Sequence, residues 1–260
     1  MGSYELGFRE GMYVNPFDVN IIHFLNQFAQ QSHFRDYFID TVSTNRLLTT
    51  AFLSSILWWA WFRNDITGQS SEQAGVLCED RKIITTGVIL CILAIFMARA
   101  LAVLLPFRER PLRNPALHFH LPFGLNTNNL FGWSSFPSDH ATFFFALGMT
   151  IFCISRKLGI AVWCYSFFVA CVPLVYQGIH YPTGILAGAL IGTAIGSLNL
   201  NKRVRASLSS APLRWVAQSP RTFYPCLFLI TFLFGVLFNP VRLIATASQH
   251  AIRDILHHHF

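Results

Sequence analysis

Two histidines lie in short motifs at the water ends of apolar stretches of the chain. His140 occurs in FPSDHA (136–141) and His180 occurs in QGIHYPTG (177–184). An imidazole that is unprotonated near neutral pH can attack phosphorus directly and form a phosphohistidine, which water later hydrolyses. His180 stands in a turn just before Pro182, where we expect the ring to be held by the turn and open to water. The motifs therefore indicate phosphate chemistry at a membrane surface.

The motif around His140 also predicts the start of a helix. Ser138 follows Pro137 and can cap the helix, so that the free amides of the next residues, Asp139 among them, point outward. The N-terminus of a helix binds anions, and His140 on its first turn is placed to give a proton to a leaving oxygen. The alternative is an interfacial histidine that only hydrogen-bonds a backbone carbonyl.

The loop PFRERPLRNP (106–115) is dense in arginine. It holds Arg108, Arg110 and Arg113 within a few residues. A guanidinium group donates two parallel hydrogen bonds and suits a phosphate well. A basic loop that only touches lipid headgroups explains the same residues equally well when the loop is considered alone.

The elements that must position these residues are membrane helices. The chain has 260 residues, of which 53% are hydrophobic and only 12% are charged, and one soluble core cannot bury that much apolar surface. We predict an all-α, polytopic membrane helical bundle of about six transmembrane helices. The expected spans are 46–62, 82–105, 140–155, 158–179, 183–200 and 222–238.

The ends of the chain are too polar to cross lipid. Residues 17–39 mix apolar and polar side chains in an amphipathic pattern, so we expect residues 1–45 to form an interfacial N-terminal segment with an amphipathic helix. Residues 241–260 form a tail, in which the run His257, His258 and His259 is more simply a frayed terminus than a metal site. The whole chain, 1–260, is predicted to be one membrane-embedded domain.

The distribution of basic residues predicts the orientation. The loops 63–81, 156–157 and 201–221 share one side and are rich in Lys and Arg, which favours the cytoplasm. Both histidine motifs would then face the exterior, which is the periplasm if the membrane is a bacterial inner membrane. The net charge of +7 is explained by topology and anionic headgroups, so we expect membrane lipids as partners and no nucleic acid.

These residues resemble the type 2 phosphatidic acid phosphatases, which include the undecaprenyl pyrophosphate phosphatases. The family pattern is Lys, six residues, Arg-Pro; then Pro-Ser-Gly-His; then Ser-Arg, five residues, His, three residues, Asp. Arg110 with Pro111, Ser138 with His140, and His180 match these elements in turn. The resemblance implies His180 as nucleophile, His140 as general acid, and Arg110 with Ser138 as phosphate ligands. FPSDHA is most similar to the branch that acts on polyprenyl pyrophosphates.

Three positions depart from the family pattern. Val103 stands in place of the lysine, Leu174 in place of the arginine and Gly184 in place of the aspartate. Arg99 lies one helical turn before Val103 and is our candidate replacement for one cation. Arg108 is the candidate for the other cation, and Asp139 is the acid that could approach His180 through space.

The sequence therefore predicts a lipid-phosphate phosphatase whose substrate is a lipid phosphate, most simply a polyprenyl pyrophosphate. We expect no metal and no other cofactor, since HExxH, GxSxG and Walker patterns and carboxylate clusters are missing from the sequence. A phosphotransferase would use the same histidines. A scaffold that binds phosphate without turnover is the alternative outside the enzyme class, and a transporter is disfavoured because the two halves show no inverted repeat.

Overall fold

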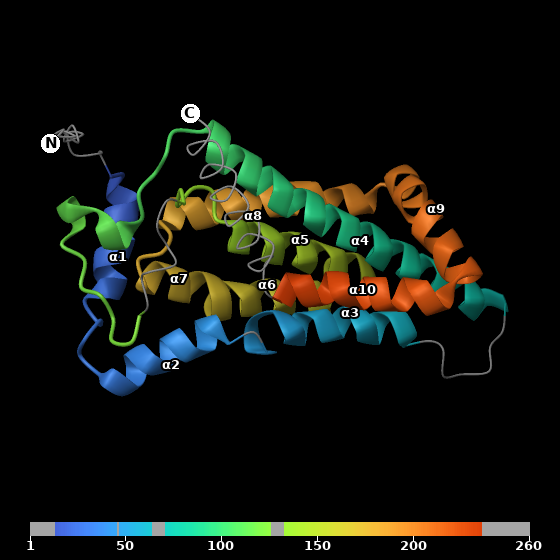
Figure 1. The fold of residues 1–260 in the computed structure, drawn as a ribbon, viewed down its shortest axis with the longest axis horizontal. Coiled ribbons are helices and arrows are strands. Elements are labelled where there is room, and N and C mark those ends of the chain that lie inside the picture. The colour runs from blue at the N-terminus through green and yellow to red at the C-terminus, as the bar shows by residue number, and fades with distance from the viewer. Residues whose placement is uncertain (1–13, 46, 64–70, 126–132, 236–260) are drawn as a thin grey trace, which may run out of the picture.

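The computed structural model describes residues 14–45, 47–63, 71–125 and 133–235. The described residues form helices, turns and loops and contain no strand, as the all-α prediction requires. The longer helices run along the long axis of the molecule, whereas α1 and α9 lie across its opposite ends (Figure 1). The helices are α1 (Pro16–Asn26), α2 (His33–Thr44), α3 (Phe52–Phe62), α4 (Ser71–Leu104), α5 (Asp139–Ile154), α6 (Arg156–Ser166), α7 (Val172–Tyr176), α8 (Pro182–Ser197), α9 (Lys202–Gln218) and α10 (Pro220–Gly235).

The chain is an integral membrane protein. Within the described part of the chain, three helical stretches are long and apolar enough to cross a bilayer: Glu79–Leu104, Arg156–Tyr176 and Pro182–Leu200. The second of these joins α6 to α7 through a π-helical turn at Phe167–Cys171. Shorter apolar helices occupy the other three predicted spans, at Phe52–Phe62, Asp139–Ile154 and Pro220–Phe234. The six expected spans thus coincide with apolar helices, and the number of crossings stays a prediction.

Helices α5 and α8 pack closely against each other because one face of α8 is a stripe of glycines. A Cβ atom at Gly188 would lie 2.4 Å from the Ser138 carbonyl oxygen, and one at Gly192 would lie 2.2 Å from that of Thr142. Side chains larger than hydrogen therefore do not fit at these positions without moving backbone. The close contact fixes the first turn of α8 beside the first turn of α5, which is where the two histidine motifs lie.

Two segments differ from their predicted structure. Most of the segment 201–221, expected as a loop, forms α9, which Asn201 caps and which contains Pro212. A hydropathy argument misses this helix because four basic residues interrupt its apolar side chains and leave no long apolar stretch. The predicted span 158–179 also ends earlier, at Tyr176, so that the turn before Pro182 is longer than expected.

The N-terminal amphipathic segment consists of two helices. α1 ends near Gln27 and α2 is capped by Ser32, with Gln30 between them in a left-handed conformation (φ 63°). One face of α1 is buried through residues spaced four apart, namely Asp18, Ile22 and Asn26. The opposite faces of the two helices expose aromatic side chains, which fits a location at the membrane interface without testing it. The predicted tail 241–260, with its three histidines, lies outside the described residues.

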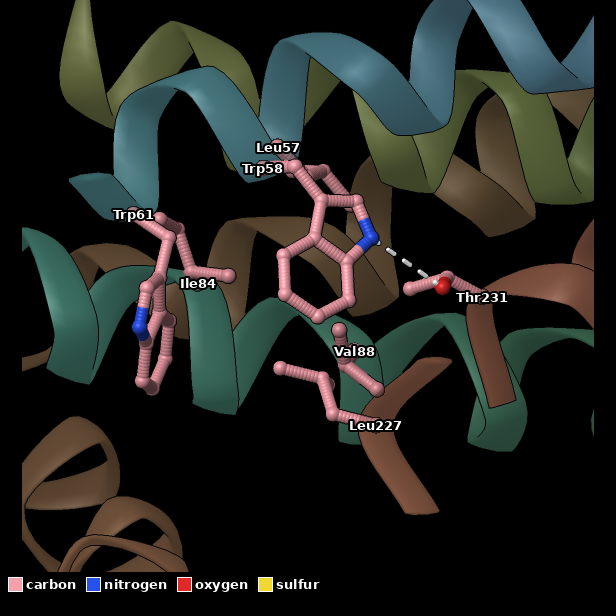
Figure 2. A pocket seen from close by; sticks show the side chains of 7 residues that line it. All are labelled: Leu57, Trp58, Trp61, Ile84, Val88, Leu227 and Thr231. Atoms are coloured by element: carbon pink, nitrogen blue, oxygen red, sulfur yellow. Dashed lines mark hydrogen bonds between the residues drawn. The ribbon is translucent and has the colours of Figure 1, made fainter. Parts of the chain in front are cut away.

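A small apolar pocket lies between α3, α4 and α10 (Figure 2). It is lined by Leu57, Trp58, Trp61, Ile84, Val88, Leu227 and Thr231. The indole of Trp58 donates a hydrogen bond to the Thr231 hydroxyl at 3.2 Å across this pocket. Ile84 precedes Arg99 by fifteen residues on α4, or about 22 Å of helix, so the pocket is remote from the histidine motifs.

Candidate active site

The two histidine motifs meet where α5 and α8 begin. α5 starts at Asp139 with Ser138 as its N-cap, whose hydroxyl accepts a hydrogen bond from the Ala141 amide at 3.4 Å. α8 starts at Pro182, and His180 lies in the turn before it, as predicted. The centroids of the His140 and His180 rings are 6.3 Å apart. The folded chain thus brings together two imidazoles that are forty residues apart in sequence.

His180 is held by a backbone carbonyl. Its Nδ1 lies 2.8 Å from the carbonyl oxygen of Ser135. Because a carbonyl oxygen only accepts hydrogen bonds, Nδ1 must carry the proton, which leaves the lone pair of the neutral ring on Nε2. Nε2 points toward Asp139, whose Oδ1 is 4.0 Å away. The ring therefore presents its nucleophilic nitrogen to the other site residues.

His180 is buried, contrary to the prediction that its ring is open to water. Only 3% of the residue is exposed. The prediction was wrong because the folded turn packs against the segment that leads into α5, where the Ser135 carbonyl oxygen and Asp139 lie close to the ring. Burial, and secondarily the Arg110 guanidinium, lower the pKa of His180 from its ordinary value of 6.5 to about 3. The ring is consequently neutral, and able to act as a nucleophile, over the whole physiological pH range.

Asp139 lies between the two histidines and Arg99. Its Oδ1 is 3.2 Å from Nδ1 of His140, and its other oxygen forms an ion pair with Arg99. The Arg99 guanidinium also lies over the ring of Trp133, at 5.2 Å from the centroid. Arg99 therefore reaches the site from α4, as expected of a replacement cation, and Asp139 approaches His180 through space. It approaches Nε2, however, and not the Nδ1 atom that an orienting acid would hold.

The two arginines of the loop have different partners. Arg110 is buried and donates to the carbonyl oxygen of Ile179 at 2.9 Å, so its charge lies beside the His180 turn. Arg108 forms an ion pair with Asp18 of α1 at 2.7 Å and donates to the Thr183 hydroxyl at 2.8 Å. Arg110 and Ser138 are thus placed next to the histidines, whereas Arg108 is engaged by α1. The predicted role of each as a phosphate ligand stays a prediction.

The three positions that depart from the family pattern differ in their exposure and in their neighbouring atoms. Val103 is 80% exposed on α4. Leu174 is buried, and its carbonyl oxygen accepts the amides of Ile179 and His180 at 2.9 and 3.2 Å. A Cβ atom at Gly184 would lie 3.0 Å from the Ser135 carbonyl oxygen, the atom that holds His180. The place of the family aspartate is therefore next to an acceptor that the backbone supplies.

Sequence reasoning missed two functional candidates. Ser135 acts through its carbonyl oxygen, which every residue type has, so its identity gives no signal. Asp18 did leave a signal, since it shares a helical face with Ile22 and an acid on an apolar face demands a buried partner. Its partners Arg108 and Thr183 are 90 and 165 residues away in sequence.

The same cluster could in principle hold a cation. Ligand atoms of Asp139, His140 and His180 all lie within 4.8 Å of one another. However, Arg99 already pairs with Asp139 and the charge of Arg110 acts on His180. Two guanidinium groups beside the imidazoles favour an anion over a divalent cation. The charges of the site therefore fit a phosphate better than a metal ion, and the absence of a metal stays a prediction.

Comparison with known proteins identifies the family of this helical membrane protein. The PAP2 superfamily profile matches residues 43–207. The chain therefore belongs to the PAP2 superfamily. It is also 41% identical, over 59 residues, to the bacitracin transport permease protein BcrC of Bacillus licheniformis. That match covers 23% of this chain and 29% of the relative. No solved structure matches the chain at a significant level.

We expect the protonation of His180 to be directly observable. In detergent-solubilised protein with ¹⁵N-labelled histidine, the NMR signals of His180, assigned by their loss in His180→Gln, should be those of a neutral ring protonated at Nδ1 from pH 5 to pH 8. The lowered pKa also sets how the free energy of unfolding depends on pH, since between pH 6.5 and about 3 the unfolded chain binds a proton that the folded ring does not. Through His180, the free energy of unfolding is therefore highest above pH 6.5 and decreases as the pH falls toward 3. A ring that titrates near pH 6.5, or that is protonated at Nε2, would contradict this geometry.

The surroundings of Gly184 predict the effect of restoring the family residue. Gly184→Asp should not raise the turnover number, because Nδ1 of His180 already has an acceptor and the added Cβ presses on that acceptor. Gly184→Ala is the matched control, since it adds the same Cβ without the carboxylate. Turnover is measured as release of inorganic phosphate. An increase of tenfold or more in the aspartate variant alone would mean that the Ser135 carbonyl does not orient the ring.

Proposed function

We propose that this protein removes phosphate from a membrane lipid phosphate, with a polyprenyl pyrophosphate as the preferred substrate, through a phosphohistidine formed on His180. Membership of the PAP2 superfamily supports a lipid phosphatase. The observation that carries the rest is the orientation of His180: its Nδ1 is tied to the Ser135 carbonyl, and its Nε2 faces the cluster that contains His140 and Arg99.

In the first step, Nε2 of His180 attacks the terminal phosphorus and the bond between this phosphorus and the leaving oxygen breaks. His140 gives a proton to that oxygen, so that the lipid monophosphate or alcohol leaves in a stable form. Arg99 and Arg110, together with the free amides at the start of α5, stabilise the negative charge of the transferred group. In the second step, His140 takes a proton from water, the water attacks the phosphohistidine, and inorganic phosphate leaves.

Asp139 fits this scheme as the partner of His140. Its carboxylate accepts the Nδ1 proton of His140, which directs the other ring nitrogen toward the leaving oxygen. A free carboxylate so near Nε2 of His180 would repel an incoming phosphate. The ion pair with Arg99 offsets this charge, which is why Arg99 and Asp139 are proposed to act as a pair.

The proposed topology has six crossings, with the site at the exterior face of the membrane. The three shorter apolar helices would complete the six crossings with the three long ones. The basic residues of α9 and of the 156–157 turn would then face the cytoplasm. We propose a bacterial inner membrane, with the lipid tail of the substrate remaining in the bilayer while its phosphate reaches the histidines at the N-terminal ends of α5 and α8.

A direct assay tests this function. Purified protein in detergent should release phosphate from a polyprenyl pyrophosphate, and vanadate should inhibit as a mimic of the attacked phosphorus. His180→Gln should lower kcat at least about 10³-fold because the nucleophile is lost, and His140→Gln should lower it about 10²- to 10⁴-fold. His23→Gln changes an exposed histidine on α1 and is the matched control. We expect it to have the same activity as the unaltered protein.

Two outcomes would contradict the proposal. Equal phosphate release from the unaltered protein and from correctly folded His180→Gln would exclude nucleophilic attack by His180. Binding of the lipid phosphate without any release would instead favour the scaffold function.

A further inference from the structure

Helix α1 places a fully buried carboxylate next to the active-site loop. Asp18 is 0% exposed. Its Oδ2 accepts hydrogen bonds from the Arg108 guanidinium at 2.7 Å and the Thr183 hydroxyl at 2.6 Å, and its Oδ1 accepts the Thr183 amide at 2.8 Å. A buried carboxylate is tolerated only with such partners, so the contacts fix one arrangement of three separate segments.

The first connection from Asp18 to His180 runs through the start of α8. Pro182 has no amide hydrogen, and Tyr181, the N-cap residue, makes no capping bond with its side chain. Asp18 satisfies the Thr183 amide in its place, so that a residue of α1 performs the capping of α8. The Arg108 guanidinium also lies 3.8 Å from the centroid of the Tyr181 ring. Tyr181 is the residue that follows His180 in the sequence. Asp18 thereby holds the C-terminal side of the His180 turn.

The second connection runs through the backbone of Arg108. The carbonyl oxygen of Arg108 accepts the Ser135 amide at 2.8 Å, and its amide donates to the Ser134 hydroxyl at 3.2 Å. The carbonyl oxygen of Ser135 is in turn the acceptor for Nδ1 of His180. Asp18 is therefore connected to His180 in two ways. One connection holds the turn that contains His180, and the other holds the imidazole ring through the Ser135 carbonyl oxygen.

We propose that Asp18 is a positioning residue of the active site, which fixes Arg108 and the start of α8 and thereby the direction of Nε2 of His180. Asp18 lies outside the segment 43–207 that matches the superfamily profile, so α1 contributes to this site from outside the matched segment. Arg108 acts through Asp18 and Tyr181, and the cations that face the transferred phosphate are Arg99 and Arg110. The effect of Asp18 on kcat rests on the proposed function, but its effect on the order of the His180 turn does not.

The test compares Asp18→Asn and Asp18→Ala with the control Asn20→Ala, which changes an exposed residue of the same helix. Asp18→Asn keeps an oxygen for the Thr183 amide but loses the charge that faces Arg108. We expect kcat to fall about 100-fold, the size of effect that a misplaced reacting group produces, while KM changes less than threefold. Hydrogen exchange at residues 178–185 should become faster in both Asp18 variants and stay unchanged in Asn20→Ala.

Exchange in the middle of α5 and α10 separates positioning from general stability. A selective increase at 178–185, with the helix cores unchanged, supports the proposal. An equal increase throughout α5 and α10 would reduce Asp18 to a stabilising residue, and Asp18→Asn with kcat within twofold of the unaltered protein and normal exchange would exclude positioning outright. If Asp18→Ala does not fold, Thr183→Val removes only the hydroxyl contact and should give a smaller, selective increase. If the unaltered protein releases no phosphate, the proposed function fails, and the exchange data still decide the role of Asp18.

Discussion

The geometry of the site depends on the hydrogen bond from Nδ1 of His180 to the Ser135 carbonyl oxygen. This bond decides which nitrogen carries the proton and therefore which nitrogen can attack. A carbonyl oxygen can take the place of a carboxylate here because it, too, accepts a hydrogen bond at a fixed position. It adds no negative charge near the phosphate, whereas a carboxylate would. The family aspartate is absent from Gly184, and the acceptor that orients the ring is nevertheless present.

The Ser135 carbonyl is in turn positioned by the rest of the fold. The Ser135 amide and hydroxyl donate to the carbonyl oxygens of Arg108 and Glu109, and the Ser138 amide donates to that of Gly184. The glycine stripe on α8 permits the close approach that the last of these bonds requires. Packing between α5 and α8, the arginine loop and α1 thus converge on one short stretch of backbone before α5. Charge is arranged around the same point, with Arg99 paired to Asp139 and Arg110 beside the His180 turn.

The sequence was sufficient for features whose signal is local. Ser138 was predicted as a helix cap from its residue type and its place after Pro137, and the structure confirms it. Family membership also followed from three short motifs. Features that depend on long-range contacts were not predicted: the acceptor for His180 is a backbone atom, and the partners of Asp18 are distant in sequence. The burial of His180 was missed for the same reason, since Ser135 and Asp139 come close to its ring only after folding. α9 was missed because its four basic residues leave no apolar stretch that hydropathy would detect.

Trapping of the phosphorylated protein tests the central claim most directly. The protein is mixed with substrate labelled in its terminal phosphate, quenched in alkali within a single turnover, digested and analysed by mass spectrometry. The account predicts a phosphoryl group on Nε2 of His180 that appears before free phosphate and disappears as phosphate is released. Turnover with the label on His140 or another residue, or turnover with no phosphorylated protein at any time point, would contradict it.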